Sequence, residues 1–171
     1  MGSNLSGLWG NPQQCLKRAY QELRLIFGEK TTVSSFFVTE PVGIVRQSRF
    51  LNAVVRIEAR VVPAKLLRIL KDLEKKSGRQ ASAGTRWGPR TLDLDIIDHG
   101  RRVRGWYAPN SHLRPSRLPQ NLILPHPQAH ARAFVLVPLL EVAPHWIHPA
   151  LHISGRRLLL RLLDRRGVVR A

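Results

Sequence analysis

The chain has 171 residues, with 28 lysines and arginines against 11 aspartates and glutamates, which gives a net charge of +17. This length predicts one domain with a substantial core, and an apolar content of 43% excludes a disordered or low-complexity chain. The apolar runs are too short for a membrane span, and residues 1–10 lack the pattern of a secretory signal. The single cysteine, Cys15, excludes an intrachain disulfide and a cysteine zinc cluster, and it indicates a reducing, cytoplasmic setting.

The positive charge indicates a polyanionic partner, which could be nucleic acid, an anionic membrane or a phosphorylated small molecule. Arginine supplies 22 of the 28 basic residues. Because a guanidinium group can place two hydrogen bonds on one phosphate, this bias fits phosphate binding. A coding bias toward arginine would produce the same excess, so both explanations stay open.

The first half of the chain predicts two helices and two strands. Asn11 followed by Pro12 is typical of a helix start, and apolar residues then recur at helical spacing as far as Gly28. A second helix is predicted from Pro63 to Ser77. β-Branched and aromatic residues predict strands over 31–39 and 50–60.

The second half is less regular. Small, basic and glycine-containing residues predict a mobile loop over 79–90, and alternation predicts a third strand over 91–98. Further along, the pattern predicts an irregular segment over 99–120, a short strand over 122–124, a helix from about 129 that Pro138 interrupts, and a basic amphipathic helix over 154–166. Together these elements predict one α+β domain over 1–171, with helices on one face of a mainly antiparallel sheet.

The strongest candidate for chemistry is the segment Arg86-Trp87-Gly88-Pro89-Arg90-Thr91-Leu92-Asp93-Leu94-Asp95-Ile96-Ile97. In a strand, Leu92, Leu94 and Ile96 would face the core, and Thr91, Asp93 and Asp95 would share the other face. Two neighbouring carboxylates suit Mg²⁺, which prefers oxygen ligands and binds substrate phosphates. The alternative is a solvated strand face, but acids are scarce in this chain and arginines adjoin the pair.

This segment resembles the signature of the 6-hydroxymethyl-7,8-dihydropterin pyrophosphokinase family. Three other blocks are similar to the family in the same order: Gly2-Ser3-Asn4-Leu5, the stretch from Val33 to Val54, and the stretch from Leu124 to Leu139. The resemblance covers most of residues 2–150. It implies a ferredoxin-like α+β sandwich and transfer of the β,γ-diphosphate of ATP to the hydroxymethyl group of a dihydropterin, with release of AMP.

The resemblance also implies the roles of particular residues. Asp93 and Asp95 would hold two Mg²⁺ ions, Arg79 and Arg90 would clamp the transferring phosphates, and Asp95 is a hypothetical general base. The pterin would be bound by Thr39, Val42, Phe50, Asn52 and Phe134, with the two rings stacking on it. ATP would be bound by Glu74, Trp87, Ile96, His126 and Arg132. The loop over 79–90 is expected to close after both substrates bind and exclude water.

The chain departs from the family at three places. The family has a complete central strand before the Gly-Ser-Asn turn, whereas here Gly2 follows Met1 directly, so that strand is expected to be absent. We favour a start assigned too far downstream, or a truncated chain, over a remodelled sheet. Ala81 stands where the family often has a further arginine, and the basic segment 101–120 is either an insertion beside the ATP site or a solvated excursion.

Two other functions compete with this interpretation. A degenerate relative could bind nucleotide or pterin without turnover, and a basic protein with aromatic residues on a sheet could bind nucleic acid. The nucleic-acid interpretation accounts neither for the two aspartates nor for the ordered blocks. The missing strand supports the degenerate relative, whereas the two aspartates, Arg90, Asn52 and Phe134 oppose it. The expected partners are therefore the small molecules ATP and dihydropterin, with neither membrane nor nucleic acid, and we expect a monomer.

Overall fold

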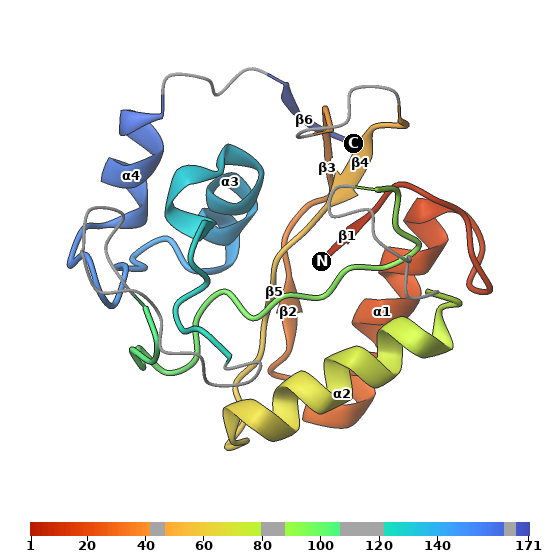
Figure 1. Cartoon of the computed structure of the whole chain (residues 1–171), viewed down its shortest axis with the longest axis horizontal. Helices are drawn as coiled ribbons and strands as arrows, with labels where there is room; N and C mark the ends of the chain where they lie inside the picture. The colour runs from red at the N-terminus through yellow and green to blue at the C-terminus, as the bar shows by residue number, and fades with distance from the viewer. Residues whose placement is uncertain (42–46, 80–87, 107–121, 163–166) are drawn as a thin grey trace.

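The computed structural model describes residues 1–41, 47–79, 88–106, 122–162 and 167–171, and these residues form an α+β architecture (Figure 1). The α-helices are α1 (Pro12–Phe27), α2 (Pro63–Lys76), α3 (Ala133–Val142) and α4 (Gly155–Arg161), with a 3₁₀ turn at Ala129–Ala131. The strands are β1 (Gly2–Ser3), β2 (Thr32–Val33), β3 (Phe37–Thr39), β4 (Phe50–Asn52), β5 (Val55–Arg56) and β6 (Val168–Arg170). Within these residues, none of the helices has the length and apolar character needed to cross a bilayer.

The strands form two antiparallel sheets. One has the order β1-β4-β3-β6, and the other pairs β2 with β5. In the larger sheet Thr39 lies opposite Phe50 and Phe37 lies opposite Asn52. This register brings two predicted pterin residues, Thr39 and Phe50, to neighbouring strands. The expectation of a mainly antiparallel sheet is confirmed.

Helix α1 begins and ends where the sequence predicts. The Asn11 side chain accepts a hydrogen bond from the Gln14 amide, and the Gln14 side chain accepts one from the Asn11 amide, which together form a capping box. The helix ends at Gly28, whose φ of 90° favours glycine. Cys15 is fully buried on its inner face, where burial raises the pKa of the thiol to about 11. The cysteine is therefore an inert part of the core.

The helices lie on both sides of the strands, so the expectation that they cover one face is wrong. Figure 1 shows α1 and α2 on one side and α3 and α4 on the other. The reason lies in α3, whose sequence AFVLVPLLEV is apolar almost all round. It buries Leu136 and Leu139 in a second cluster with Leu158 of α4, apart from the main core around Leu16, Leu23 and Leu92.

Pro138 does not interrupt α3 as the sequence predicted. The helix runs unbroken from Ala133 to Val142 with Pro138 inside it. Pro138 lacks the amide that would bond the carbonyl of Phe134, so the helix continues with one hydrogen bond fewer. Burial of its neighbours Leu136 and Leu139 offsets this loss.

The predicted strand over 91–98 is reduced to a single bridge. Asp93 exchanges two backbone hydrogen bonds with Gly2, of 2.8 and 2.9 Å, while the amide of Leu94 donates to the Glu74 carboxylate instead of to a strand. The predicted core face is confirmed, since Leu92, Leu94 and Ile96 are buried. Thr91 is also buried, so only Asp93 and Asp95 of the opposite face are accessible.

Other strands differ from prediction in their extent. The stretch 31–39 divides into β2 and β3, and 50–60 divides into β4 and β5. The short strand over 122–124 is only a bridge between Leu124 and Arg104. The basic C-terminal helix is described as α4, and the chain then adds β6 to the edge of the larger sheet, which the sequence pattern did not predict.

Candidate active site

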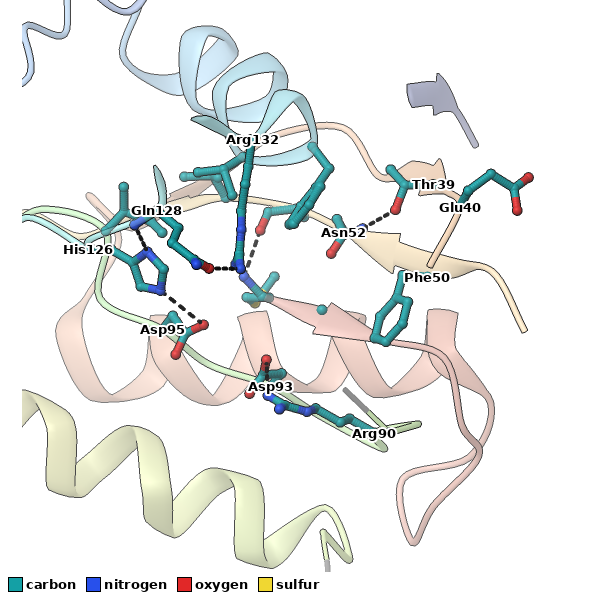
Figure 2. Close-up of a pocket in the computed structure, with 18 residues that line it drawn as sticks. Thr39, Glu40, Phe50, Asn52, Arg90, Asp93, Asp95, His126, Gln128 and Arg132 are labelled. Atoms are coloured by element: carbon teal, nitrogen blue, oxygen red, sulfur yellow. Dashed lines mark hydrogen bonds and ion pairs between the residues drawn. The ribbon is translucent and has the colours of Figure 1, made fainter. Parts of the chain in front are cut away.

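A pocket of about 320 Å³ lies where β3, β4, the chain around Asp93 and the start of α3 converge. Figure 2 shows the side chains that point into it. Most of the residues that the sequence proposed for the site line this pocket: Thr39, Phe50, Asn52, Arg90, Asp93, Asp95, His126, Arg132 and Phe134. They come from segments far apart in the chain, so the fold assembles the site that the sequence blocks suggested.

Asp93 lies between two arginines. Its Oδ1 is 2.7 Å from Nη1 of Arg79, and its Oδ2 is 2.6 Å from Nη1 of Arg90. Burial on its own would raise the pKa of Asp93, but the charges of Arg90 and Arg79 hold that pKa below its ordinary value. Asp93 is therefore an anion whose two oxygens both have cationic partners.

Asp95 is the more accessible acid, and it faces His126. Its side chain is 48% exposed, and Oδ2 is 4.0 Å from Nε2 of the histidine. Nδ1 of His126 accepts a hydrogen bond from the amide of Gln128, which directs Nε2 toward the acid (Figure 2). Burial lowers the pKa of His126 and outweighs the opposing charge of Asp95. His126 can therefore act as a neutral hydrogen-bonding group beside the carboxylate.

Arg132 reaches into the pocket from the turn that precedes α3 (Figure 2). Its guanidinium group donates to the side-chain oxygen of Gln128 and lies 5.5 Å from the centre of the Phe134 ring. A cation over an aromatic face is attracted by the ring electrons. Arg132 is thus held at the pocket wall with its charge directed inward.

The opposite end of the pocket carries a buried amide. Nδ2 of Asn52 donates to the hydroxyl of Thr39 over 2.8 Å, and both residues are buried. A Cβ atom at Gly2 would lie 2.9 Å from Oδ1 of Asn52, so only glycine leaves room for that amide. Phe50 lines the pocket beside this pair. The arrangement offers an amide edge and an aromatic face to a flat polar ring.

Three predicted residues lie outside the pocket lining. Glu74 is 4% exposed and lies behind Asp93, where it accepts hydrogen bonds from Lys71 and from the amide of Leu94. Burial raises the pKa of Glu74, although those hydrogen bonds oppose the shift. Arg79 bridges Glu74 and Asp93, and Ile96 lines a neighbouring groove. Val42 and Trp87 lie outside the described residues, as do Ala81, most of the loop at 79–90 and most of the segment 101–120.

The pocket also contains residues that sequence reasoning missed. Glu40, Gln128, Ile97 and Val135 line it. Gln128 could have been found, because it lies two residues after His126 in a block already linked to the site. Ile97 and Val135 carry no such signal, since an aliphatic side chain in a pocket wall has the same sequence pattern as one in the core.

The donor set fits a divalent cation that has few protein ligands. Among the described residues there is no cluster of three or more histidines, cysteines or acids able to hold a metal alone. Asp93 and Asp95 nevertheless present carboxylate oxygens at one pocket end, and Mg²⁺ usually takes only one or two carboxylates and completes its shell with water and phosphate oxygens. The two acids therefore fit Mg²⁺ that arrives with a nucleotide.

The sequence profile of the 7,8-dihydro-6-hydroxymethylpterin-pyrophosphokinase family matches residues 1–144 of this chain. The chain belongs to this family. Similar proteins include 2-amino-4-hydroxy-6-hydroxymethyldihydropteridine pyrophosphokinase from Porphyromonas gingivalis, 36% identical over 87% of this chain and 90% of that protein. The protein of the same name from Synechocystis is 37% identical over 93% of this chain and 70% of its own length.

A larger relative is the folate synthesis bifunctional protein of Arabidopsis thaliana. It is 35% identical over 91% of this chain, but the chain spans only 31% of its length. The similarity to that protein is therefore confined to one part of it.

Proposed function

We propose that this pocket transfers the β,γ-diphosphate of ATP to the hydroxymethyl group of 6-hydroxymethyl-7,8-dihydropterin and releases AMP. Membership of the pyrophosphokinase family supports this activity in folate biosynthesis, and it favours neither the degenerate relative nor the nucleic-acid-binding protein. The observation that carries the proposal is one pocket with Asp93 and Asp95 at one end and the Asn52–Thr39 pair at the other.

The pterin end would bind the ring by its edge and its faces. The Asn52 amide can donate to and accept from the ring edge, while Thr39 holds that amide in place. Phe50 and Phe134 line the same pocket and would stack on the flat ring. Val42 is proposed to add a backbone contact. Together these groups would hold the hydroxymethyl group toward the acidic end.

The phosphate end would supply charge stabilisation. Asp93 and Asp95 would hold two Mg²⁺ ions, which would stabilise negative charge on the phosphates and favour ionisation of the attacking hydroxyl. Arg79 and Arg90 would neutralise charge that builds on the bridging oxygen as AMP leaves. His126 and Arg132 would contact the phosphates, and Glu74, Trp87 and Ile96 are proposed at the nucleoside. Asp95 as general base stays a hypothesis.

The finer fold, the cellular setting and the oligomeric state are proposals as well. The ferredoxin-like sandwich stays a proposal drawn from the family resemblance; β1 pairs with β4 on one side, and its Gly2 forms an isolated bridge with Asp93 on the other. A groove of about 450 Å³ continues from Met1 between residues 54–59 and 94–100. The absence of a longer first strand, the cytoplasmic location and the monomeric state stay predictions.

Replacement of Asp95 tests the proposed function. Asp95→Ala should abolish AMP formation from ATP, Mg²⁺ and dihydropterin, because it removes one of the two carboxylates available to the metal. Asp72→Ala is the matched control, since Asp72 is an exposed acid of α2. AMP release would be followed by chromatography. Near-normal turnover in Asp95→Ala would contradict the metal assignment.

A further inference from the structure

Every oxygen of the Asp93 carboxylate has an arginine partner. Nη1 of Arg79 lies 2.7 Å from Oδ1, and Nη1 of Arg90 lies 2.6 Å from Oδ2. The three side chains are only 21–29% exposed, so solvent screens these pairs less than surface pairs. A cation that coordinates Asp93 therefore competes with the arginine that each oxygen already contacts.

Arg79 has a second acceptor behind the site. The same Nη1 atom is 2.5 Å from Oε1 of Glu74, whose other oxygen is 2.9 Å from Nζ of Lys71. Glu74 is also fixed by the amide of Leu94, 2.7 Å from Oε1. Arg79 can therefore lose Asp93 and still keep a buried anionic partner. Arg90 lines the pocket, so its guanidinium group is positioned to contact an anion that binds there.

We propose that Arg79 and Arg90 act as resident counterions of Asp93, and that a divalent cation competes with them and displaces them as it binds that carboxylate. This inference rests on the metal assignment made under the proposed function. Displacement has two consequences. Binding of the cation without nucleotide is weakened, because it competes with two charge-assisted hydrogen bonds. Binding of the cation with nucleotide is favoured, because the displaced guanidinium groups gain phosphates as new partners.

Glu74 is a positioning residue in this exchange. It does not line the pocket, but it keeps Arg79 within reach of the site after Asp93 changes partner. Its contacts with Lys71, Arg79 and the amide of Leu94 offset the cost of placing a carboxylate in a nearly buried position.

Binding of Mn²⁺ to the nucleotide-free protein tests the exchange. Free Mn²⁺ would be measured by electron paramagnetic resonance for wild type, Arg79→Gln, Arg90→Gln and Lys71→Gln. We expect either arginine variant to bind Mn²⁺ about tenfold more tightly, since a charge in direct contact is removed. Lys71→Gln is the matched control, because Lys71 also acts on Asp93 through its charge but contacts Glu74. Its effect should be less than about threefold, because solvent and distance weaken a charge that makes no contact.

The controls separate failure of the exchange from failure of the metal site. Asp93→Asn and Asp95→Asn should each weaken Mn²⁺ binding; if neither does, the metal assignment itself is wrong. If the aspartate variants lose Mn²⁺ but Arg90→Gln binds it no more tightly than wild type or Lys71→Gln, the exchange is overturned and the metal site stands. Arg90→Gln decides the result if Arg79→Gln, which leaves Glu74 poorly paired, does not fold by circular dichroism.

Discussion

At the scale of single residues, we expect the two ends of the pocket to respond differently to substitution. Arg90 contacts Asp93 at the phosphate end, whereas Asn52 contacts Thr39 at the other end. Arg90→Ala should therefore lower kcat about a hundredfold, because one charge-stabilising donor is lost from the transition state. The Kd for dihydropterin, measured by calorimetry, should change less than about threefold, the limit expected when no direct contact is lost.

The matched control for this variant is Arg68→Ala, which removes an exposed arginine from α2. It should leave both quantities unchanged. A variant Arg90→Ala that keeps its kcat but loses pterin affinity would contradict the assigned role.

For Asn52 we expect substitution to weaken dihydropterin binding. Asn52→Leu removes the amide that binds Thr39 and leaves a side chain of similar size. Loss of hydrogen bonds to the ring edge should weaken dihydropterin binding about tenfold or more, since each buried bond is worth about 1–3 kcal/mol when its partner is left unpaired. Calorimetric titration measures this, with Thr39→Val as a milder comparison. Unchanged affinity in a folded Asn52→Leu protein would refute the pterin contact.

At the scale of elements, the segment between α3 and α4 makes stability depend on pH. His148 is fully buried, and burial lowers its pKa to about 4. Nδ1 accepts hydrogen bonds from the amides of Ala150 and Leu151, which requires that nitrogen to be unprotonated. The rings of Trp106, His130 and Trp146 pack around it with centre-to-centre distances of 5.2–5.6 Å. The native state therefore holds His148 neutral.

Because the pKa of His148 is lowered in the folded state, stability falls as the pH decreases. The stabilising contribution of neutral His148 is complete above its unfolded-state pKa near 6.5 and is lost as the pH falls toward 4. Between pH 7.5 and pH 5, the free energy of unfolding should fall by about 2 kcal/mol from this group. Urea unfolding measures it. His148→Gln should flatten the pH dependence, whereas His145→Gln, at an exposed position, should not. Equal slopes for His148→Gln and wild type would exclude His148 as the cause.

Elements were predictable where local chemistry determines them. The capping residue Asn11 and the apolar spacing behind it place α1 correctly, and Pro63 does the same for α2. Strands were predicted too long, because their extent depends on partners that the sequence pattern does not show. The segment 91–98 has strand-like alternation, yet Glu74 takes the amide of Leu94, and β6 has a partner in β3 that lies 129 positions earlier.

In the site, too, local sequence predicts some features, whereas others depend on how distant segments pack. Alternation predicts that Leu92 and Leu94 are buried while Asp93 and Asp95 stay accessible, and the structure confirms this. The shared location of Asn52 and Phe134 in one pocket was predictable from the family resemblance, and not from any local sequence pattern. Neither the alternation pattern nor the family resemblance could show that Arg79 bridges Glu74 and Asp93, because that contact depends on how α2 packs behind the chain at 92–94.

At the scale of the whole molecule, the net charge of +17 is larger than the site requires. The proposed phosphate contacts use Arg79, Arg90 and Arg132, with His126 as a neutral group. Much of the remaining basic charge is in the segments 101–117 and 156–170, to which we assign no role. Net charge alone therefore indicates a polyanionic partner, and the proposed site narrows the choice of partner to a nucleotide.

The central claim is that this chain transfers a diphosphate in one step. Phosphorus NMR of a mixture of the protein, ATP, Mg²⁺ and 6-hydroxymethyl-7,8-dihydropterin tests it most directly, because it identifies which phosphate bond breaks. We expect equal amounts of AMP and a pterin diphosphate, with neither product formed when dihydropterin is left out. Formation of ADP with a pterin monophosphate, or no turnover by the folded protein, would contradict it.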